Sequence, residues 1–459
     1  MIALKLPDPI RIFGKKRSTW TCCTAFLILV QLIVVLLTFT DYGITIDEPP
    51  QAEYGKAIFD WFRSGFQDPE FFNRIRTIDL ERYGGLFDTL VYPLTRLLPF
   101  DRFETRHLCN ALIGLLGIGI IYRLGAHIGS PGVGFLAALF LILTPRYYGH
   151  SFNNPKDIPF AVCYLLSLYH LIRSVGMLPD LPWKQVWKTG LAIGLALGVR
   201  FGGLLLFVYL GLAFFIRYLN LARPADRRTR LSLLRNFVTQ TTAIFAIAWT
   251  SMLAFWPRAL IEPFTYPIQV LRFFSDFTRH NTTFFEGRPL SSVDVPWYYA
   301  PKWFLISSPE FLFIGLAIAP IIALAVLRHS QPLNTPILPW SILSLSAFFP
   351  LVYVILKGSP LYDGFRHFLF VLPPVALIAA ASIHQALKKN LPPVLRLSLI
   401  GLLALLTGIT LWDMIRLHPN QYVYFNRFVA GGIKQASKQY QTDYWENSYK
   451  QGIWWIDEN

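Results

Sequence analysis

The apolar residues of this chain occur in long uninterrupted blocks, and this feature constrains the fold more than any other. Several blocks, such as 20–40, 337–356 and 395–415, hold about 20 residues, the length that crosses the hydrocarbon core of a bilayer as a helix. Charged residues make up only 15% of the chain, against roughly 25% in a typical soluble domain. The sequence therefore predicts an all-α, multi-pass membrane protein.

We expect about eleven transmembrane helices. Their predicted ranges are 20–40, 106–123, 131–146, 158–175, 187–200, 203–219, 237–256, 308–327, 337–356, 367–386 and 395–415. The fifth and sixth come from one block that is too long for a single helix, and Arg200-Phe-Gly-Gly marks a hairpin in its middle. The first span has the basic flank of a signal peptide, but it is too long and no small-residue cleavage site follows it before Asp47, so we expect it to stay uncleaved.

The net charge of +15 follows the membrane topology and does not indicate nucleic-acid binding. The basic residues gather before the first span and in alternate loops: Lys15, Lys16 and Arg17; Arg217, Arg223, Arg227, Arg228, Arg230 and Arg235; Lys388, Lys389 and Arg396. Cytoplasmic loops carry such an excess of Lys and Arg. We therefore predict a cytoplasmic N-terminal segment, 1–19, in a plasma (inner) membrane protein. An odd number of spans then places the C-terminus outside.

The long connecting segments are all predicted on the outer side. Within a transmembrane domain of residues 20–415 they are the loops 41–105 and 257–306; the shorter loops 147–157 and 357–366 lie on the same side, and a small outer tail, 416–459, follows. An activity built on these loops would face the periplasm or the exterior. The first loop carries apolar residues with a helical period at 54–62 and again at 86–98, which predicts amphipathic helices. We expect both to lie in the membrane interface, although packing against other loops would give the same pattern.

The first candidate site is the acid pair Asp47-Glu48, directly after the first span. A carboxylate near a bilayer is costly unless it is solvated or paired, so such residues tend to be functional. The alternative is that both acids only cap a helix that starts at Pro49, because acids favour helix N-termini.

The second candidate site is the stretch PRYYGHSFNNPKD at 145–157. It brings Arg146, His150, Asn153, Asn154, Lys156 and Asp157 into a short connection between spans. Asn-Pro is typical of turns, so we expect irregular backbone, which is tolerated at membrane depth where it lines a cavity. A hydrated connector is the alternative.

The third candidate site comprises Arg366 and His367, at the outer end of the tenth span. Arg200, at the turn between the fifth and sixth spans, resembles Arg366 in position. An arginine there either snorkels to lipid phosphate or holds the phosphate of a specific ligand. The aromatic and polar tail after 416 is expected to pack on the outer loops.

The chain resembles the GT-C superfamily of polytopic glycosyltransferases, in its protein O-mannosyltransferase and lipid A aminoarabinose transferase branch. The features that carry the resemblance are the first span, the Ile46-Asp47-Glu48 motif that follows it, the amphipathic first loop and the further spans. The resemblance covers roughly residues 20–385, and the stretch from Pro145-Arg146 to Asn154-Pro155-Lys156-Asp157 resembles the second acidic loop of that branch. It implies that Asp47 is the catalytic acid position, that Glu48 is its neighbour and that Asp157 is the second-loop acid.

The same resemblance implies a polyprenyl-phosphate sugar donor in the membrane lipid and a hydroxyl acceptor on a glycan, lipid or protein. It further implies transfer of a hexose or pentose by direct displacement with inversion, in which the leaving phosphate needs cations. By position we assign donor or acceptor binding to Arg146, His150, Asn154, Lys156, Arg200, Arg366 and His367. No cofactor is certain; if a divalent metal is present, Asp47 and Asp157 would hold it. Three alternatives remain: a transporter or flippase of a lipid-linked saccharide, a polymerase or ligase that uses a lipid-diphosphate donor, and a non-catalytic scaffold.

Overall fold

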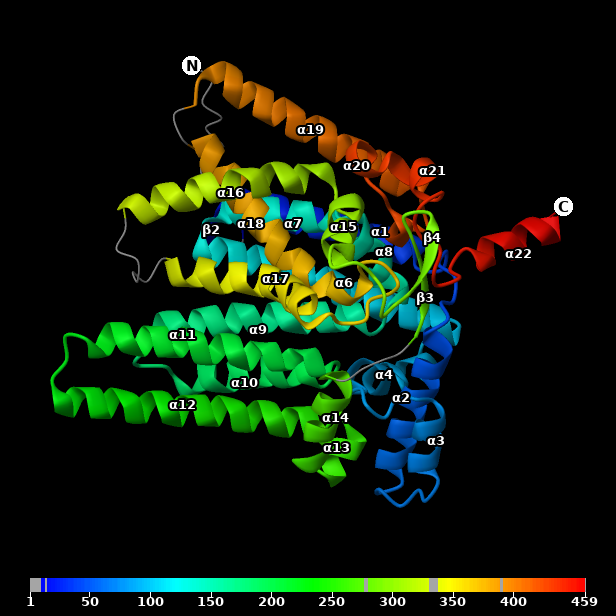
Figure 1. Cartoon of the computed structure of the whole chain (residues 1–459), viewed down its shortest axis with the longest axis horizontal. Coiled ribbons are helices and arrows are strands. Elements are labelled where there is room, and N and C mark those ends of the chain that lie inside the picture. Colours follow the sequence, from blue (N-terminus) through cyan, green and yellow to red (C-terminus); the bar gives the residue numbers. More distant parts are fainter. Residues whose placement is uncertain (1–9, 13–14, 276–279, 330–336, 389–390, 459) are drawn as a thin grey trace.

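The structure is a computed structural model that describes residues 10–12, 15–275, 280–329, 337–388 and 391–458. Among these residues, eight helical segments are long and apolar enough to cross a membrane. They are α1 (Thr19–Thr38), α6 (Arg102–Ile128), α9 (Asp157–Met177), η1 (Phe201–Leu204) with α11 (Leu205–Ala222), α16 (Glu310–His329), α17 (Ile337–Lys357), η2 (Arg366–Val371) with α18 (Leu372–Lys388), and α19 (Pro393–Arg416). These helices form one bundle (Figure 1). The expected all-α membrane fold is therefore confirmed.

Three more predicted spans also fall on helices of the bundle. Helices α7 (Pro131–Ile142) and α8 (Pro145–Asn153) together would form a ninth span, but they are bent by 65° at their junction. Helices α10 (Trp183–Leu197) and α12 (Arg227–Leu253) pack against each other. The count of eleven membrane crossings stays a prediction, because neither α10 nor α12 meets the length and hydropathy that define the other spans.

The bend between α7 and α8 corrects the expectation of irregular backbone over 145–157. Pro145 occupies the first turn of α8, where its missing N–H costs nothing, but its ring prevents α7 from continuing through it. The chain therefore turns at Thr144 and forms a second helix, and the non-helical part is limited to residues 154–156.

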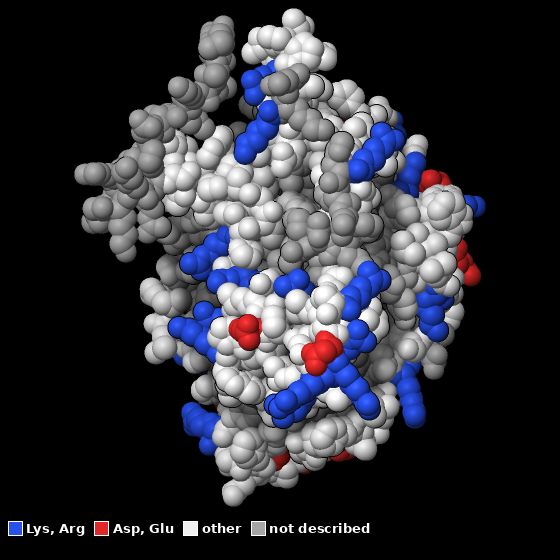
Figure 2. Space-filling view, turned by 90° about the vertical axis from the view of Figure 1, so that its left-hand side faces the viewer, with Lys and Arg blue, Asp and Glu red and all other residues white. Residues whose placement is uncertain are grey.

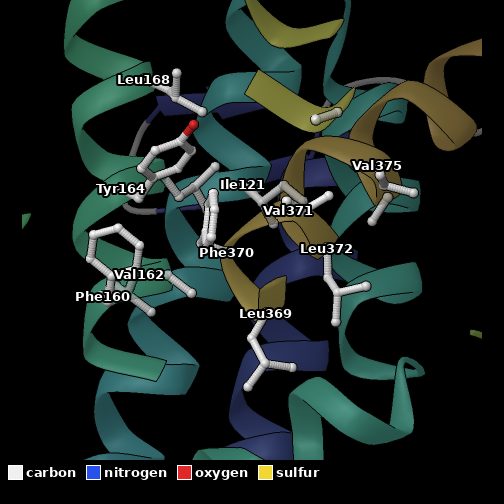
Figure 3. Close-up of a cluster of buried hydrophobic side chains, with 14 of the residues drawn as sticks. Ile121, Phe160, Val162, Tyr164, Leu168, Leu369, Phe370, Val371, Leu372 and Val375 are labelled. Atoms are coloured by element: carbon white, nitrogen blue, oxygen red, sulfur yellow. The ribbon is translucent and has the colours of Figure 1, made fainter. Parts of the chain in front are cut away.

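The most buried helix of the bundle is α18 with its preceding turn η2. Of the residues in the most apolar stretch of that segment, 89% are buried, whereas only 11% are buried in the corresponding stretches of α1 and α19. Figure 3 shows side chains of η2, α18, α6 and α9 packed together, among them Leu369, Val375, Ile121, Phe160 and Leu168. Close packing in such a core fixes the helix ends. The first residues of α9 and of η2, Asp157 and Arg366, are thereby held in place.

The connecting segments gather at one end of the bundle, on the right in Figure 1. They include α2 (Glu48–Arg63), α3 (Phe71–Thr77), α4 (Leu86–Val91), α5 (Leu94–Leu97), α13 (Pro257–Ile261), α14 (Thr265–Ser275), β3 (Thr282–Phe285), β4 (Arg288–Ser291), α15 (Tyr299–Ser307), η3 (Gln421–Val423), α20 (Arg427–Ala430), α21 (Gly432–Ala436) and α22 (Tyr449–Glu458). Strands β3 and β4 pair antiparallel with Thr282 opposite Ser291, and Phe285 bridges to Tyr440 of the tail. The tail up to Asn447 packs on these loops, as expected, whereas no residue of α22 is buried.

The first amphipathic helix packs on protein. Tyr54, Ile58 and Trp61 of α2 are buried against Phe71 and Ile75 of α3, in a cluster separate from the main core. The apolar face of α2 is therefore not free to enter lipid, and the expected position in the membrane interface is wrong for this face. The apolar residues of α2 recur with a helical period because they are buried against other parts of the first loop.

The second amphipathic stretch differs from the first. Leu90 is 55% exposed and Leu97 is 77% exposed, whereas Leu86 and Phe87 are buried. An apolar side facing away from protein is what an interfacial helix needs, so an interfacial position of 90–98 stays a prediction.

The opposite end of the bundle is rich in Lys and Arg. Figure 2 views this end and shows many basic and few acidic side chains. The α11–α12 connection lies here (Figure 1), and Arg223, Arg227, Arg228 and Arg230 are exposed in it. The strands β1 (Ile10–Ile12) and β2 (Lys15–Arg17) form a short antiparallel pair, with Ile10 opposite Arg17. Of the basic residues assigned to cytoplasmic loops, Lys389 lies outside the described residues. The basic loops and the long segments are thus at opposite ends, and which end faces the cytoplasm stays a prediction.

Candidate active site at one end of the bundle

Arg366 lies at the centre of a group of charged residues from distant parts of the chain. Its Nη1 lies 3.2 Å from Oδ2 of Asp47 and 3.9 Å from Oδ2 of Asp157. Its Nη2 lies 2.7 Å from Oδ2 of Asp363. The side chain is only 7% exposed. The buried guanidinium therefore joins the loop after α1, the start of α9 and the loop before η2.

Asp157 is held by a second cation and by its own turn. Nη2 of Arg200 lies 2.5 Å from Oδ1 of Asp157. Nδ2 of Asn154 donates to the other carboxylate oxygen at 2.9 Å, and the backbone N–H of Asp157 donates to Oδ1 of Asn154 at 2.9 Å. Asn154 thus orients Asp157, and Asp157 sets the position of both arginines.

Asp47 is the accessible carboxylate of this group, because 33% of its side chain is exposed against 3% for Asp157. Burial by itself raises the pKa of Asp47. The positive charge of Arg366 lowers this pKa, and so do those of Lys156 and Arg200. The cations outweigh burial, so the pKa of Asp47 lies below its ordinary value and the group is ionised at neutral pH.

Lys156 is the cation in this group that has no described acid within ion-pair distance. Its Nζ lies 4.3 Å from the ring centre of Tyr83. Burial lowers the pKa of Lys156 to about 8, with Arg200 and Arg366 acting in the same direction and Asp47 opposing them. A small pocket lies beside it, lined by Gln51, Tyr54, Leu80, Tyr83, Gly84, Phe87, Asp88, Pro155, Lys156 and Val199. An anion that reached this pocket would meet a positive charge that no described carboxylate pairs with directly.

Glu48 faces away from Asp47 and is fully buried. Its Oε2 accepts hydrogen bonds from the backbone N–H of Thr45 at 2.8 Å and from the Thr45 hydroxyl at 3.1 Å. Its Oε1 lies 3.0 Å from Nε2 of His107. Asp47 occupies the N-cap position of α2, but its side chain makes no cap hydrogen bond. Both acids thus lie at the N-terminus of α2, as the helix-cap alternative requires, but Asp47 makes no side-chain cap hydrogen bond and Glu48 holds the loop that carries Asp47.

The structure does not bring every expected residue to this group. Arg146 is buried with its guanidinium near the rings of Trp303 and Phe425, at 5.2 and 5.4 Å, and it forms no ion pair with a described acid. His150 lies between the tail and the second loop: its Nε2 is 2.9 Å from the Tyr444 hydroxyl and its Nδ1 is 3.2 Å from Nδ2 of Asn154. His150 therefore contacts the charged group through Asn154, whereas the described contacts of Arg146 are with aromatic rings.

His367 follows Arg366 but turns to Tyr362. The two rings contact edge to face, with centres 4.9 Å apart. The Tyr362 ring also lies 5.6 Å from the Arg366 guanidinium, and His367 itself is close enough to Arg366, Arg200 and Lys156 to feel their charges.

Asp363 is a member of the group that the sequence reasoning missed. Burial raises the pKa of this carboxyl and Arg366 opposes the shift. The sequence could have indicated Asp363, because this acid precedes Arg366 by only three residues. The sequence reasoning also missed a buried ion pair between Asp88 and Arg106. Oδ1 of Asp88 lies 2.5 Å from Nη2 of Arg106, and nothing in the local sequence indicates that these two residues meet.

The carboxylates do not suit a metal ion. Among the described residues, no three His, Cys, Asp or Glu side chains are grouped as a metal site. Asp47 and Asp157, the expected ligands, both face the Arg366 guanidinium. A divalent cation between them would have to displace that guanidinium, so the residues present do not fit a metal.

The fold resembles those of two solved membrane proteins. ArnT from Cupriavidus metallidurans bound to undecaprenyl phosphate matches 88% of this chain with 16% identity and a TM-score of 0.53. The oligosaccharyltransferase AglB from Archaeoglobus fulgidus, in complex with an inhibitory peptide and a dolichol-phosphate, matches 88% with 14% identity and a TM-score of 0.54. The present chain spans 65% of the ArnT chain and 56% of the AglB chain. It is thus an integral membrane protein with the GT-C fold that the sequence resemblance implied.

A family model adds to this class assignment. The model of the dolichyl-phosphate-mannose-protein mannosyltransferase family matches residues 94–261. This stretch contains Asp157 and Arg200, but neither Asp47 nor Arg366. No curated protein matches the sequence significantly.

Proposed function

We propose that this protein is a membrane glycosyltransferase that moves a hexose or pentose from a polyprenyl-phosphate donor to an acceptor hydroxyl. The observation that carries the proposal is an ionised, partly exposed carboxylate, Asp47, beside three cations, of which Lys156 has no described acid partner. Such a site offers a proton acceptor and an anion-binding position side by side. The GT-C fold and the family match support it, as do the two fold relatives that hold undecaprenyl phosphate and dolichol-phosphate.

In the proposed reaction the donor phosphate binds at Lys156, Arg200 and Arg366. The acceptor oxygen attacks the anomeric carbon while Asp47 takes the proton of the hydroxyl. The bond between the anomeric carbon and the phosphate oxygen breaks, and its electron pair stays on the polyprenyl phosphate. The cations stabilise the charge that develops there. The products are the glycosylated acceptor, with an inverted anomeric centre, and polyprenyl phosphate.

The proposed location is the periplasmic or lumenal face of the membrane. The basic loops at the opposite end of the bundle support this orientation through the positive-inside rule (Figure 2). The acceptor is a hydroxyl of a glycan, lipid or protein.

A flippase would need a polar path through the bundle. The interior between α6, α9 and α18 is instead filled by apolar side chains (Figure 3), and the described ion pairs around Asp47 lie at one end. This arrangement favours chemistry at the membrane surface over transport.

The test uses the purified full chain in proteoliposomes with labelled polyprenyl-phosphate hexose or pentose and a mixture of candidate acceptors. We expect free polyprenyl phosphate and a labelled acceptor, and inversion is read from the product by NMR. Donor that crosses the bilayer chemically unchanged would instead identify a flippase. In a parallel assay with lipid-diphosphate donors, consumption of those donors while polyprenyl-phosphate donors stay intact would identify a polymerase or ligase.

A further inference from the structure

One short segment of the C-terminal tail reaches the charged group directly. We call residues 443–447 the strap. Its central residue, Trp445, is 2% exposed, and the centre of its ring lies 4.6 Å from Cζ of Arg366. The backbone carbonyl of Trp445 accepts a hydrogen bond from the N–H of Ile46 at 3.3 Å. One tail residue therefore contacts both the central cation and the loop that carries Asp47.

Trp445 covers one face of the Arg366 guanidinium. The acids bind its N–H edges, because Asp47 and Asp363 pair with Nη1 and Nη2. The Trp445 ring lies within the distance at which arginine and an aromatic face attract each other. A planar guanidinium held by its edges and by a ring has few orientations left.

Two further residues fasten the strap to the site. Oδ1 of Asn447 accepts from the backbone N–H of Gly43 and from Nδ2 of Asn153, each at 2.9 Å. The Tyr444 hydroxyl lies 2.9 Å from Nε2 of His150. The strap thus joins the Asp47 loop to α8.

Two glycines provide the space for the tail. A methyl group on Gly43 would lie 2.2 Å from the carbonyl oxygen of Asn447, and one on Gly149 would lie 2.4 Å from the backbone N of Tyr422. These distances are too short for any side chain. The Asp47 loop and α8 are therefore shaped to receive the backbone of the tail.

We propose that the strap is a wall of the donor site and that Trp445 is a positioning residue, which holds Arg366 in the orientation that binds the donor phosphate. This inference rests on the proposed function for the identity of the ligand. It gives the tail a role in the reaction beyond packing on the loops. Trp445 itself transfers no proton and forms no bond.

The test compares Trp445→Ala and Trp445→Phe with Trp454→Ala in the full chain. Trp454 is an exposed tryptophan of α22 and serves as the control. We expect Trp445→Ala to weaken undecaprenyl phosphate binding, and to raise KM for the donor more than it lowers kcat, by on the order of 10-fold. Trp445→Phe keeps a ring and should recover most of this loss. Equal affinity in Trp445→Ala and Trp454→Ala overturns the proposal.

A second measurement does not depend on the donor. The rate at which phenylglyoxal modifies Arg366, followed by mass spectrometry, should rise in Trp445→Ala and stay low in Trp445→Phe. The same rise is expected in Gly43→Ala, which displaces the strap from the other side, but not in Gly452→Ala, where a methyl meets open space. Unchanged rates overturn the role of the strap. A wild-type protein that binds no polyprenyl phosphate overturns the proposed function instead, while the modification rates still decide the role of Trp445.

Discussion

Asp47 and Glu48 are neighbours in the sequence but differ in exposure and in partners. Asp47 is partly exposed and faces three cations, whereas Glu48 is enclosed by Thr45 and His107. Neighbouring side chains point in different directions along any regular backbone. A shared role for the two acids is therefore not expected. The role of each can be tested by substituting the corresponding amide residue.

We expect Asp47→Asn to lower kcat by about 10²-fold or more with the fold intact, because the amide cannot take a proton. Glu48→Gln should cost less turnover but lower the melting temperature, because it perturbs buried hydrogen bonds. Sugar transfer and thermal melts of both purified variants check this. An active Asp47→Asn, or a result in which only Glu48→Gln is inactive, would contradict the assignment.

Arg366 is expected to bind the donor phosphate and to neutralise three carboxylates. Arg366→Ala should raise KM for the donor strongly, and it should also destabilise the protein by about 3–5 kcal/mol because buried acids lose their partner. Arg366→Lys should be only partly tolerated, since a point charge does not replace a planar fork. Donor titrations with a folding check measure both effects. Unchanged donor affinity in the alanine variant would leave Arg366 with a structural role alone.

The lowered pKa of Lys156 predicts that activity falls at alkaline pH. Its pKa of about 8 means that the side chain is charged below this pH and neutral above it, so donor binding weakens as the pH rises through 8. We expect kcat/KM for the donor to fall above pH 8 in the wild type. In Lys156→Arg this fall should disappear, because arginine stays charged. A wild-type profile that stays flat to pH 9.5 would show that Lys156 does not bind the donor. Asp47, with its lowered pKa, adds no acid limit near neutrality.

At the scale of elements, the α2–α3 pair should act as a small structural unit. Trp61 is 3% exposed, and its ring stacks on Phe71 with centres 4.7 Å apart. Trp61→Ala should therefore cost about 3–5 kcal/mol of stability within this unit, seen as a lower melting temperature or as faster proteolysis of residues 64–80. Trp183→Ala, at a 59% exposed tryptophan, is the control. Equal melts for the two variants would argue that the apolar face of α2 is not packed as described.

The helices of the bundle could be predicted from the sequence, whereas the contacts of the site could not. Each span follows from its own apolar length, which is local information. The pairing of Asp47 with Arg366 joins residues 319 positions apart, and no local pattern specifies it. Asp47, Asp157, Arg200, Arg366 and Lys156 were nevertheless selected, because charges at span ends are costly and therefore informative.

Two expectations failed for physical reasons. The stretch 145–157 was expected to be irregular because it contains Asn-Pro, but Pro145 starts a helix as readily as it ends one. The face of α2 was assigned to the membrane interface because amphipathicity does not distinguish lipid from protein as the apolar partner. Donor binding by Arg146, which rests on its position alone, stays a prediction, and the described contacts of its guanidinium are with aromatic rings.

At the scale of the whole molecule, the two ends of the bundle should face opposite sides of the membrane. We expect a reporter inserted at 224–225, in the basic α11–α12 connection, to be cytoplasmic, and one fused after Asn459 to be outside. Paired alkaline phosphatase and fluorescent protein fusions measure this. Reporters on the same side would contradict the arrangement in Figure 1, and a cytoplasmic C-terminus would contradict the count of eleven crossings.

The distance in sequence between Asp47 and its cation also orders events during biosynthesis. At about 5–20 residues per second, the ribosome adds Arg366 roughly 16 to 64 seconds after Asp47. Trp445 follows later still. A nascent chain thus enters the membrane with the carboxylate present and its counter-ion missing. A translation product that stops between the two residues can insert helices but cannot assemble the charged group.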